Sequence, residues 1–372
     1  MSVDAILCTH ADSMCEIFMP FEKPLIVVAS TRYEIGRYEE DRWSQWNHNL
    51  QKIAAKPGNV VGANNVYDLE YMKYFTGIQN IQLLPTLALY VSARYSPTKR
   101  EILLCPSTRP VAPPLYNELM GALDVFKKRY KLTHAKNTIA DGGLVIAPVR
   151  SLYKRFEYSD LAAHPAIILM PYQLSVMSFF EFYRMGIPMF VPSPQLLTHW
   201  HMKHSVLKER SWNMIFDKPG LLSAVKKHPD YKGPMLSDPN DNLNFNSVLE
   251  WVKLGDFYTF PHVQQFDNLT HLVEMVGTTS LQELNVVSTR MRVFSETHDV
   301  TTLKSWGRAL QGVSDSFSSA RARPAAFSGT NQRRSGINDA LMSSYGLQLN
   351  MSDCLCQLPL APGTSCRSPR RR

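Results

Sequence analysis

Residues 166–193 contain the side chains with the clearest chemical potential in the sequence. An apolar run comes first, and the polar residues Ser175, Ser178 and Glu181 then open an amphipathic stretch that stops at Gly186. This order predicts a strand, a helix and a second strand, the unit that joins neighbouring parallel strands. Such strands bind anions at their carboxyl ends, where a helix N-terminus offers free backbone amides. We therefore expect an anionic ligand at the start of this helix.

The spacing of Glu181, Gly186 and Pro188 resembles the E-x4-G-x-P signature of GT-B glycosyltransferases. The resemblance implies two Rossmann-like domains and transfer of a sugar from a nucleotide-sugar donor to an acceptor. It also implies that Glu181 binds the ribose hydroxyls, a task that suits a carboxylate because it accepts two hydrogen bonds at once. The diphosphate would lie on the backbone amides and hydroxyls around Ser175 and Ser178.

The wider similarity is to an uncharacterised glycosyltransferase-like group and covers about residues 1–310. In that group a YDLEYMKYFTGI-type segment precedes a PYQLSVMSFFEFYRMGIP-type segment, and both are present here in that order. The chain departs from retaining members in two ways. It has no glycine-rich loop, and Gln173 stands where the first glutamate of an E-x7-E pair is expected. The acceptor chemistry and the retaining or inverting outcome therefore stay open.

Four further residues follow predicted strands and could face the same cleft. Arg109 could bind the diphosphate and stabilise charge on the leaving group, although it could equally be an ordinary loop arginine. His10 could be a general base because imidazole titrates near neutrality, or a hydrogen-bonded structural histidine. Arg32 and Asn65 could hold the sugar or the acceptor, while Asp68 fits a turn or helix-capping role.

Two alternative interpretations of residues in this region remain open. Glu181 could be a solvated helix carboxylate paired with Arg184 at i+3. The cluster of His199, His201 and His204 invites a metal interpretation, but only the last two share a helix face and no third ligand follows nearby. We predict no metal and no cofactor, with the nucleotide sugar acting as donor substrate.

The elements that position these residues form two βαβαβ series, which predict an α/β fold with parallel sheets. The predicted divisions are a partial N-terminal Rossmann-like domain at 1–97, a C-terminal nucleotide-sugar-binding domain at 98–312 and a disordered Ser/Arg/Pro tail at 313–372. The first domain is expected to be truncated, because residues 3–8 already resemble a strand. Expected strands include residues 5–8, 25–29, 60–63, 101–106, 137–140 and 166–170; expected helices include 42–54, 68–74, 116–130, 147–158 and 300–310.

Composition supports a globular chain with a basic end. The 372 residues are 44% apolar, and the net charge is +8. Residues 313–372 contain eight Arg against three Asp, so the basic excess gives little reason to expect a specific nucleic-acid partner. Scattered cysteines predict reduced thiols, although Cys8 and Cys15 could pair in an oxidising compartment. The longest uncharged stretch is interrupted by prolines, which argues against a membrane span.

These observations predict a glycosyltransferase with an unknown glycan, protein or small-molecule acceptor. One alternative is a non-catalytic carbohydrate- or nucleotide-binding module with a degenerate GT-B fold. Another is an interaction protein recruited through its arginine-rich tail. The expected compartment is the cytoplasm by default, or the Golgi or a membrane surface if an N-terminal segment is missing.

Overall fold

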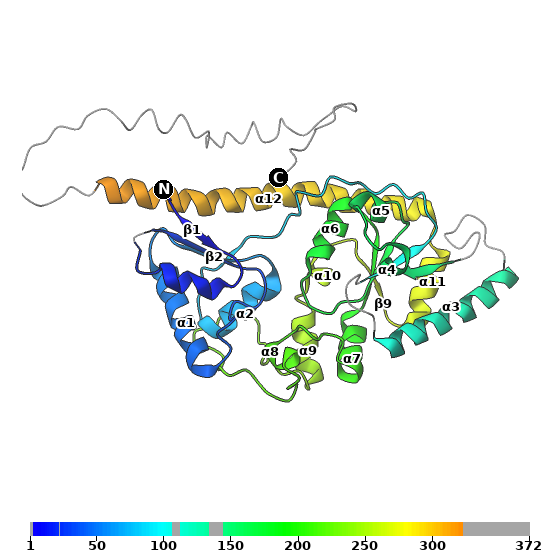
Figure 1. The fold of residues 1–372 in the computed structure, drawn as a ribbon, viewed down its shortest axis with the longest axis horizontal. Helices are drawn as coiled ribbons and strands as arrows, with labels where there is room; N and C mark the ends of the chain where they lie inside the picture. The colour runs from blue at the N-terminus through cyan, green and yellow to red at the C-terminus, as the bar shows by residue number, and fades with distance from the viewer. Residues whose placement is uncertain (1–2, 22, 106–111, 134–143, 323–372) are drawn as a thin grey trace, which may run out of the picture. The chain divides into compact units, whose positions relative to one another are not determined.

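The computed structural model describes residues 3–21, 23–105, 112–133 and 144–322. It contains two parallel β-sheets accompanied by helices, so the predicted α/β class is confirmed (Figure 1). The first sheet has the strand order β1-β2-β3-β4, and the second has the order β6-β5-β7-β8-β9. The sheets lie on either side of the predicted boundary at residue 97, and the described residues belong to one compact unit that ends at Ala322.

The first sheet is built from strands that alternate with helices along the chain. Its central strand β2 is buried at all five positions, and β3 pairs with it in parallel register. Helix α2 begins at an Asn65 cap and ends at Gly77, which adopts the left-handed conformation with φ 68°. The elements are β1 Ile6–Cys8, η1 Asp12–Phe18, β2 Leu25–Ala29, α1 Glu40–Ala55, β3 Val60–Ala63, α2 Val66–Thr76 and β4 Gln82–Leu83.

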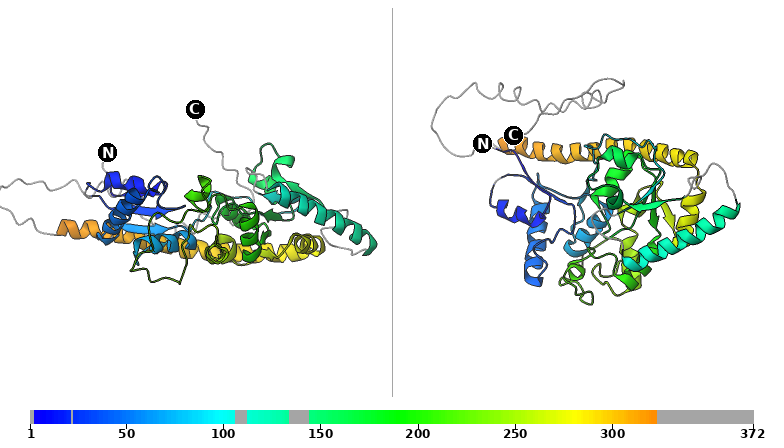
Figure 2. Two further views of the ribbon diagram at one scale, coloured as in Figure 1. Left: turned by 90° about the horizontal axis from the view of Figure 1, so that it is seen from below. Right: turned by 45° about the vertical axis from the view of Figure 1, so that its right-hand side comes forward.

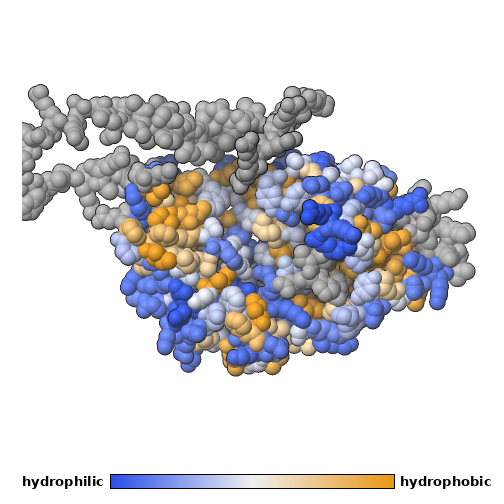
Figure 3. All heavy atoms as spheres, viewed as in Figure 1, coloured by the Kyte–Doolittle hydropathy of each residue, from blue (hydrophilic) through white to orange (hydrophobic). Residues whose placement is uncertain are grey.

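β1 forms one edge of this sheet and is flanked by exposed apolar side chains. Leu7 on the strand and Met14 and Ile17 on η1 are each more than half exposed. The orange area at the upper left of Figure 3 lies over this part of the chain. Cys8 and Cys15 form a disulfide in the structure, with their Cα atoms 5.9 Å apart. The expectation of reduced thiols is therefore wrong for this pair, which the short η1 turn brings together.

The second sheet is covered by helices from its own half. Its central strands β5 and β7 are buried at every position, as the apolar runs predict. The elements are β5 Ile102–Cys105, α3 Pro113–Thr133, β6 Ile146–Pro148, α4 Val149–Leu152, α5 Tyr158–Ala162, β7 Ile167–Leu169, α6 Met177–Met185, β8 Met189–Pro192, α7 Pro194–His204, α8 Trp212–Ile215, α9 Phe245–Val252, α10 Asp256–Thr259, β9 Gln264–Phe266 and α11 Leu269–Thr278.

Helix α12, Leu281–Ala322, packs against elements of both halves. Near its start it lies against α6, where Gly186 has φ 77° and a Cβ would stand 3.0 Å from atoms of Ser288 and Arg292. Farther along, Ala309 and Val313 are buried against the first sheet. Both views of Figure 2 show α12, yellow to orange, running alongside the two halves. The helix continues beyond residue 312, so the predicted tail boundary lies too early.

Three other predictions concern segments of the second half. The strand expected at 137–140 lies outside the described residues. The helix expected at 147–158 is replaced by β6, α4 and a loop. The segment 219–246, whose prolines predict a long surface excursion, packs on α2: the Tyr231 hydroxyl donates to Glu70 Oε2 at 3.0 Å, and the buried Asn240 donates to the Tyr71 hydroxyl at 3.0 Å. Trp251 follows in the stretch 248–253, which is expected to rejoin the core, and it is fully buried with its ring 5.6–6.1 Å from those of Tyr67, Tyr71 and Tyr74. This apolar cluster fastens the two halves together.

Candidate functional site

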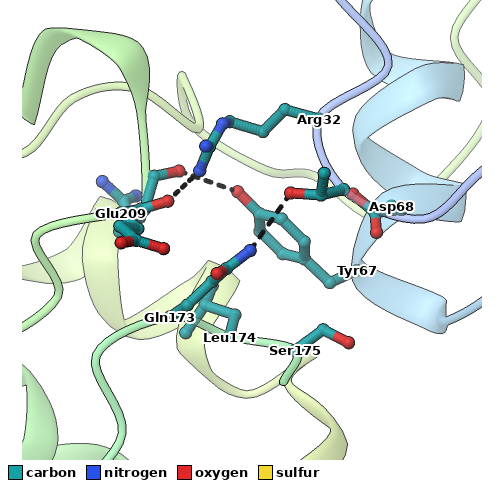
Figure 4. A pocket seen from close by; sticks show the side chains of 9 residues that line it. Arg32, Tyr67, Asp68, Gln173, Leu174, Ser175 and Glu209 are labelled. Atoms are coloured by element: carbon teal, nitrogen blue, oxygen red, sulfur yellow. Dashed lines mark hydrogen bonds between the residues drawn. The ribbon is translucent and has the colours of Figure 1, made fainter. Parts of the chain in front are cut away.

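A small pocket lies where the carboxyl ends of strands from both sheets meet. Residues 31 and 32 follow β2 in the first sheet, and residues 173–175 follow β7 in the second. Carboxyl ends of parallel strands are the usual ligand-binding edge of α/β sheets. Figure 4 shows the lining side chains converging from both halves. The pocket is lined by Thr31, Arg32, Tyr67, Asp68, Gln173, Leu174, Ser175, Glu209 and Arg210.

Two buried arginines carry guanidinium nitrogens that lack hydrogen-bond partners. Arg32 is 6% exposed, stacks over Trp212 at 4.7 Å and donates to the backbone carbonyl of Glu209, but its Nε has no partner. Arg210 is 1% exposed and donates to Asn242 Oδ1 at 2.7 Å, while its Nε and Nη2 have none. Burial lowers the pKa of Arg210. Buried charged donors without acceptors are costly, and this arrangement can bind an anion.

Asp68 is the buried carboxyl group that lines the same pocket, and the half-buried Glu209 is the second acidic residue there. Oδ2 of Asp68 accepts a 2.6 Å hydrogen bond from Asn65 Nδ2, and its buried Oδ1 has no partner. Burial raises its pKa to about 6, while the Asn65 hydrogen bond and the charge of Arg32 act in the opposite direction. Asp68 is therefore close to changing its charge at neutral pH.

Three more buried carboxyl groups surround Asp68. Asp12 is 2% exposed with both oxygens unpartnered, and burial followed by repulsion from Asp68 and Glu34 holds its pKa well above the usual range. Burial raises the pKa of Glu34 to about 7, although Tyr71 donates to it at 2.9 Å. Burial raises the pKa of Asp256 to about 8, despite a hydrogen bond from Ser175. The region therefore contains carboxyl groups whose raised pKa values favour the protonated form, next to two arginines with guanidinium nitrogens that lack acceptors.

The structure brings some of the predicted site residues together and leaves others elsewhere. Arg32 and Ser175 line the pocket, and Asn65 is buried behind Asp68. His10 is exposed, and Arg109 lies outside the described residues.

The two predicted residues of helix α6 do not line the pocket. Ser178 is partly buried on that helix. The carboxylate of Glu181 accepts hydrogen bonds from the hydroxyls of Tyr90 and Tyr158 at 2.7 and 2.8 Å. Both hydroxyl partners come from outside α6, from the connection after β4 and from α5.

Sequence reasoning missed most of the charged residues of the site. Asp12, Glu34, Arg210 and Asp256 are all at most 2% exposed. A weak signal existed for Asp12, because it follows the first predicted strand by a few residues, as His10 does. The sequence contained no such signal for Arg210 and Asp256, because they occupy segments whose packing depends on distant parts of the chain.

The pocket is nearly closed. Its cavity has a volume of about 10 Å³, which holds about one water molecule. Two hydrogen bonds cross it, from Arg32 to the Glu209 carbonyl and from Gln173 Nε2 to Thr31 Oγ1 at 3.1 Å. A ligand larger than a water molecule must therefore displace these side chains.

The histidine cluster on α7 does not line the pocket. His201 is buried, its Nδ1 has no partner, and burial lowers its pKa to about 3. His199 packs on the Phe245 ring at 4.8 Å. Within the described ranges, no group of three or more His, Cys, Asp or Glu side chains is placed to hold a metal ion.

Comparisons with known proteins give no match. No protein-family model matches the chain, and neither a curated protein nor a solved structure matches it at a significant level. In the part of the chain that the structure describes, no helix combines the length and apolar character needed to span a bilayer.

Proposed function

We propose that the protein is a glycosyltransferase that uses a nucleotide-sugar donor, with the two halves acting as the Rossmann-like domains of a GT-B fold. The observation that carries the proposal is the pair of buried arginines in the pocket, of which Arg32 follows strand β2 and Arg210 lies in the connection between α7 and α8. Arg32 comes from the first half and Arg210 from the second, and both retain unpartnered donors. Guanidinium groups suit a diphosphate because they bind its oxygens in a fork and stay charged.

The pocket supplies groups for the donor's charged part. Arg32 and Arg210 would bind the diphosphate and stabilise the charge that develops on it as the sugar leaves. Ser175 lies just before α6, whose N-cap residue Val176 makes no side-chain capping bond. Backbone amides at a helix start can donate to a phosphate oxygen, although the N–H of Phe179 already donates to the Val176 carbonyl at 3.1 Å. The ribose-binding role of Glu181 rests on the sequence resemblance alone, since its carboxylate is already held by two tyrosines.

A panel of nucleotide sugars tests the proposal directly. UDP-glucose, UDP-N-acetylglucosamine, GDP-mannose and ADP-glucose are added to the full chain, and the melting temperature is measured. A ligand at about 100 times its Kd stabilises the folded state by roughly 2.7 kcal/mol, or roughly 5–10 °C. The shift should vanish in Arg210→Gln and Arg32→Gln, each compared with its own unliganded protein. The exposed Arg129→Gln is the control and should keep it. If none of the four compounds raises the melting temperature, the proposal fails.

A non-catalytic nucleotide-sugar-binding module is the second candidate. The nearly closed pocket and the hydrogen bond of Gln173 to Thr31, at a position where retaining enzymes carry a carboxylate, favour it. The two candidates differ in turnover. An enzyme releases free nucleoside diphosphate from the bound donor, whereas a binding module returns the donor intact.

A further inference from the structure

Asp68, the buried carboxyl group of the pocket, can be given a role that the sequence did not indicate. We propose that Asp68 is the general base that takes the proton from the attacking hydroxyl, and that Asn65 is the positioning residue that orients it. This inference rests on the proposed glycosyl transfer and goes beyond donor binding, because it assigns the chemistry of the acceptor side.

The geometry singles out Asp68 among the carboxyls of the cluster. Asp68 and Glu209 line the pocket, whereas Asp12, Glu34 and Asp256 do not; of the two that line it, Asp68 is buried and Glu209 is half-buried. One oxygen, Oδ2, accepts a 2.6 Å hydrogen bond from Asn65 Nδ2, and the Asp68 backbone N–H donates to Asn65 Oδ1 at 2.7 Å. These two bonds fix the side chain at the start of α2 and leave the buried Oδ1 without a partner. A fixed carboxylate with one free oxygen is what a general base requires.

The charged surroundings keep this base close to neutrality. On the cationic side, Arg32 acts on Asp68 and stabilises its ionised form. On the anionic side stand Asp12 and Glu34 from the first half and Asp256 from the second, each with a raised pKa. Glu209 and Arg210 add one group of each sign to the lining of the same pocket.

Burial of Asp68 itself is the largest influence and raises its pKa to about 6. The nearby Tyr67 hydroxyl stays protonated, because burial raises its pKa above the ordinary value. A base that titrates near the working pH combines the correct protonation state with a sufficient affinity for the proton.

The transfer step balances with the groups in the pocket. The acceptor oxygen bonds to the anomeric carbon while the bond from that carbon to the diphosphate oxygen breaks. The electron pair of the broken bond leaves with the diphosphate, next to Arg32 and Arg210, and the acceptor proton passes to Asp68. Water as acceptor gives hydrolysis by the same route, so the reaction is measurable before the natural acceptor is identified.

The test compares donor hydrolysis and donor binding over pH 4.5–9 with the responding nucleotide sugar. Wild-type turnover should rise with pH through about 6, because the base must be ionised. Asp68→Asn should lower kcat by roughly 100-fold or more. Donor affinity, measured by calorimetry, should remain, which also shows that the variant is folded. The exposed Asp124→Asn is the control and should match the wild type.

Variants of Asn65 separate positioning from helix capping. Asn65→Asp can still cap α2 but cannot donate to Asp68, and Asn65→Ala can do neither. Both should lower kcat more than they raise KM and should move the acidic limb of the profile to higher pH, because the lost hydrogen bond favoured the ionised form. A purely structural cap would leave Asn65→Asp with the wild-type profile, which would refute the positioning role.

The outcomes distinguish this inference from the proposed function. If no nucleotide sugar binds, the proposed function fails and the base assignment falls with it. If the donor binds but the wild type does not hydrolyse it, or if Asp68→Asn hydrolyses it at the wild-type rate, the assignment alone is overturned. Loss of turnover in His10→Gln with full turnover in Asp68→Asn would transfer the role to His10.

Discussion

Replacing Asp256 by Asn should remove a large part of the pH dependence of folding stability. Burial raises the pKa of Asp256 from 3.8 to about 8. Between these values the unfolded chain has released the proton while the folded chain keeps it, so stability falls as pH rises. Each pH unit in this window costs at most about 1.4 kcal/mol. From pH 5 to pH 8 the wild type should therefore lose up to roughly 4 kcal/mol relative to Asp256→Asn, which has no such proton to release.

Urea denaturation of both proteins at pH 5 and pH 8 measures this difference. The comparison isolates Asp256, because the other buried carboxyls Asp12, Glu34 and Asp68 contribute to both proteins alike. The exposed Asp124→Asn provides a matched control, since a solvated carboxyl interacts similarly in the folded and unfolded chains. If the stability difference between wild type and Asp256→Asn is the same at both pH values, Asp256 is ionised in the fold and the reasoning about its burial is refuted.

Three further predictions concern the packing and the cross-link that stabilise the fold. Gly186→Ala should lower the melting temperature by an amount equivalent to about 1–3 kcal/mol, because φ is 77° and the added Cβ crowds α12; a neutral effect would contradict the close packing. Trp251→Ala should cost roughly 3–5 kcal/mol in urea denaturation, and a loss below about 1 kcal/mol would mean that its aromatic cluster does not fasten the halves. The Cys8–Cys15 disulfide closes a short loop, and its reduction should cost about 2–3 kcal/mol; an unchanged melting temperature in dithiothreitol would argue against the bond.

The sequence predicted the buried strands well because they depend on local composition. The runs at 25–29 and 60–63 became β2 and β3 with the predicted bounds, and both are buried throughout. The full extent of helix α12 was harder to predict from the sequence. It contains Gly307, Gly312 and many Ser and Thr residues, so its local preference for helix is weak. Packing of Ala309 and Val313 on the first sheet stabilises its distal half, and no short window of sequence contains that information.

The sequence indicated where the candidate site lies, but not which residues surround it. Strand ends indicated Arg32 and the Ser175 segment, and both line the pocket. The signature around Glu181 indicated a helix carboxylate correctly, but its hydrogen-bond partners Tyr90 and Tyr158 come from other elements. Whether a carboxylate meets a ligand or a tyrosine depends on which distant segments pack beside it, and spacing within one segment cannot report that.

The clustering of unsatisfied polar atoms explains why the pocket is the part of the chain to test first. Each buried donor or acceptor without a partner costs roughly 1–3 kcal/mol, and charged groups cost more. Arg32, Arg210 and Asp68 all carry such atoms and all line one cavity, while the neighbouring Trp251 cluster is apolar and well packed. If the residues that line the pocket served folding stability alone, apolar residues of similar volume would stabilise the fold as well or better. Local conflicts of this kind gather where a protein binds or transforms something, because the ligand supplies the missing partners.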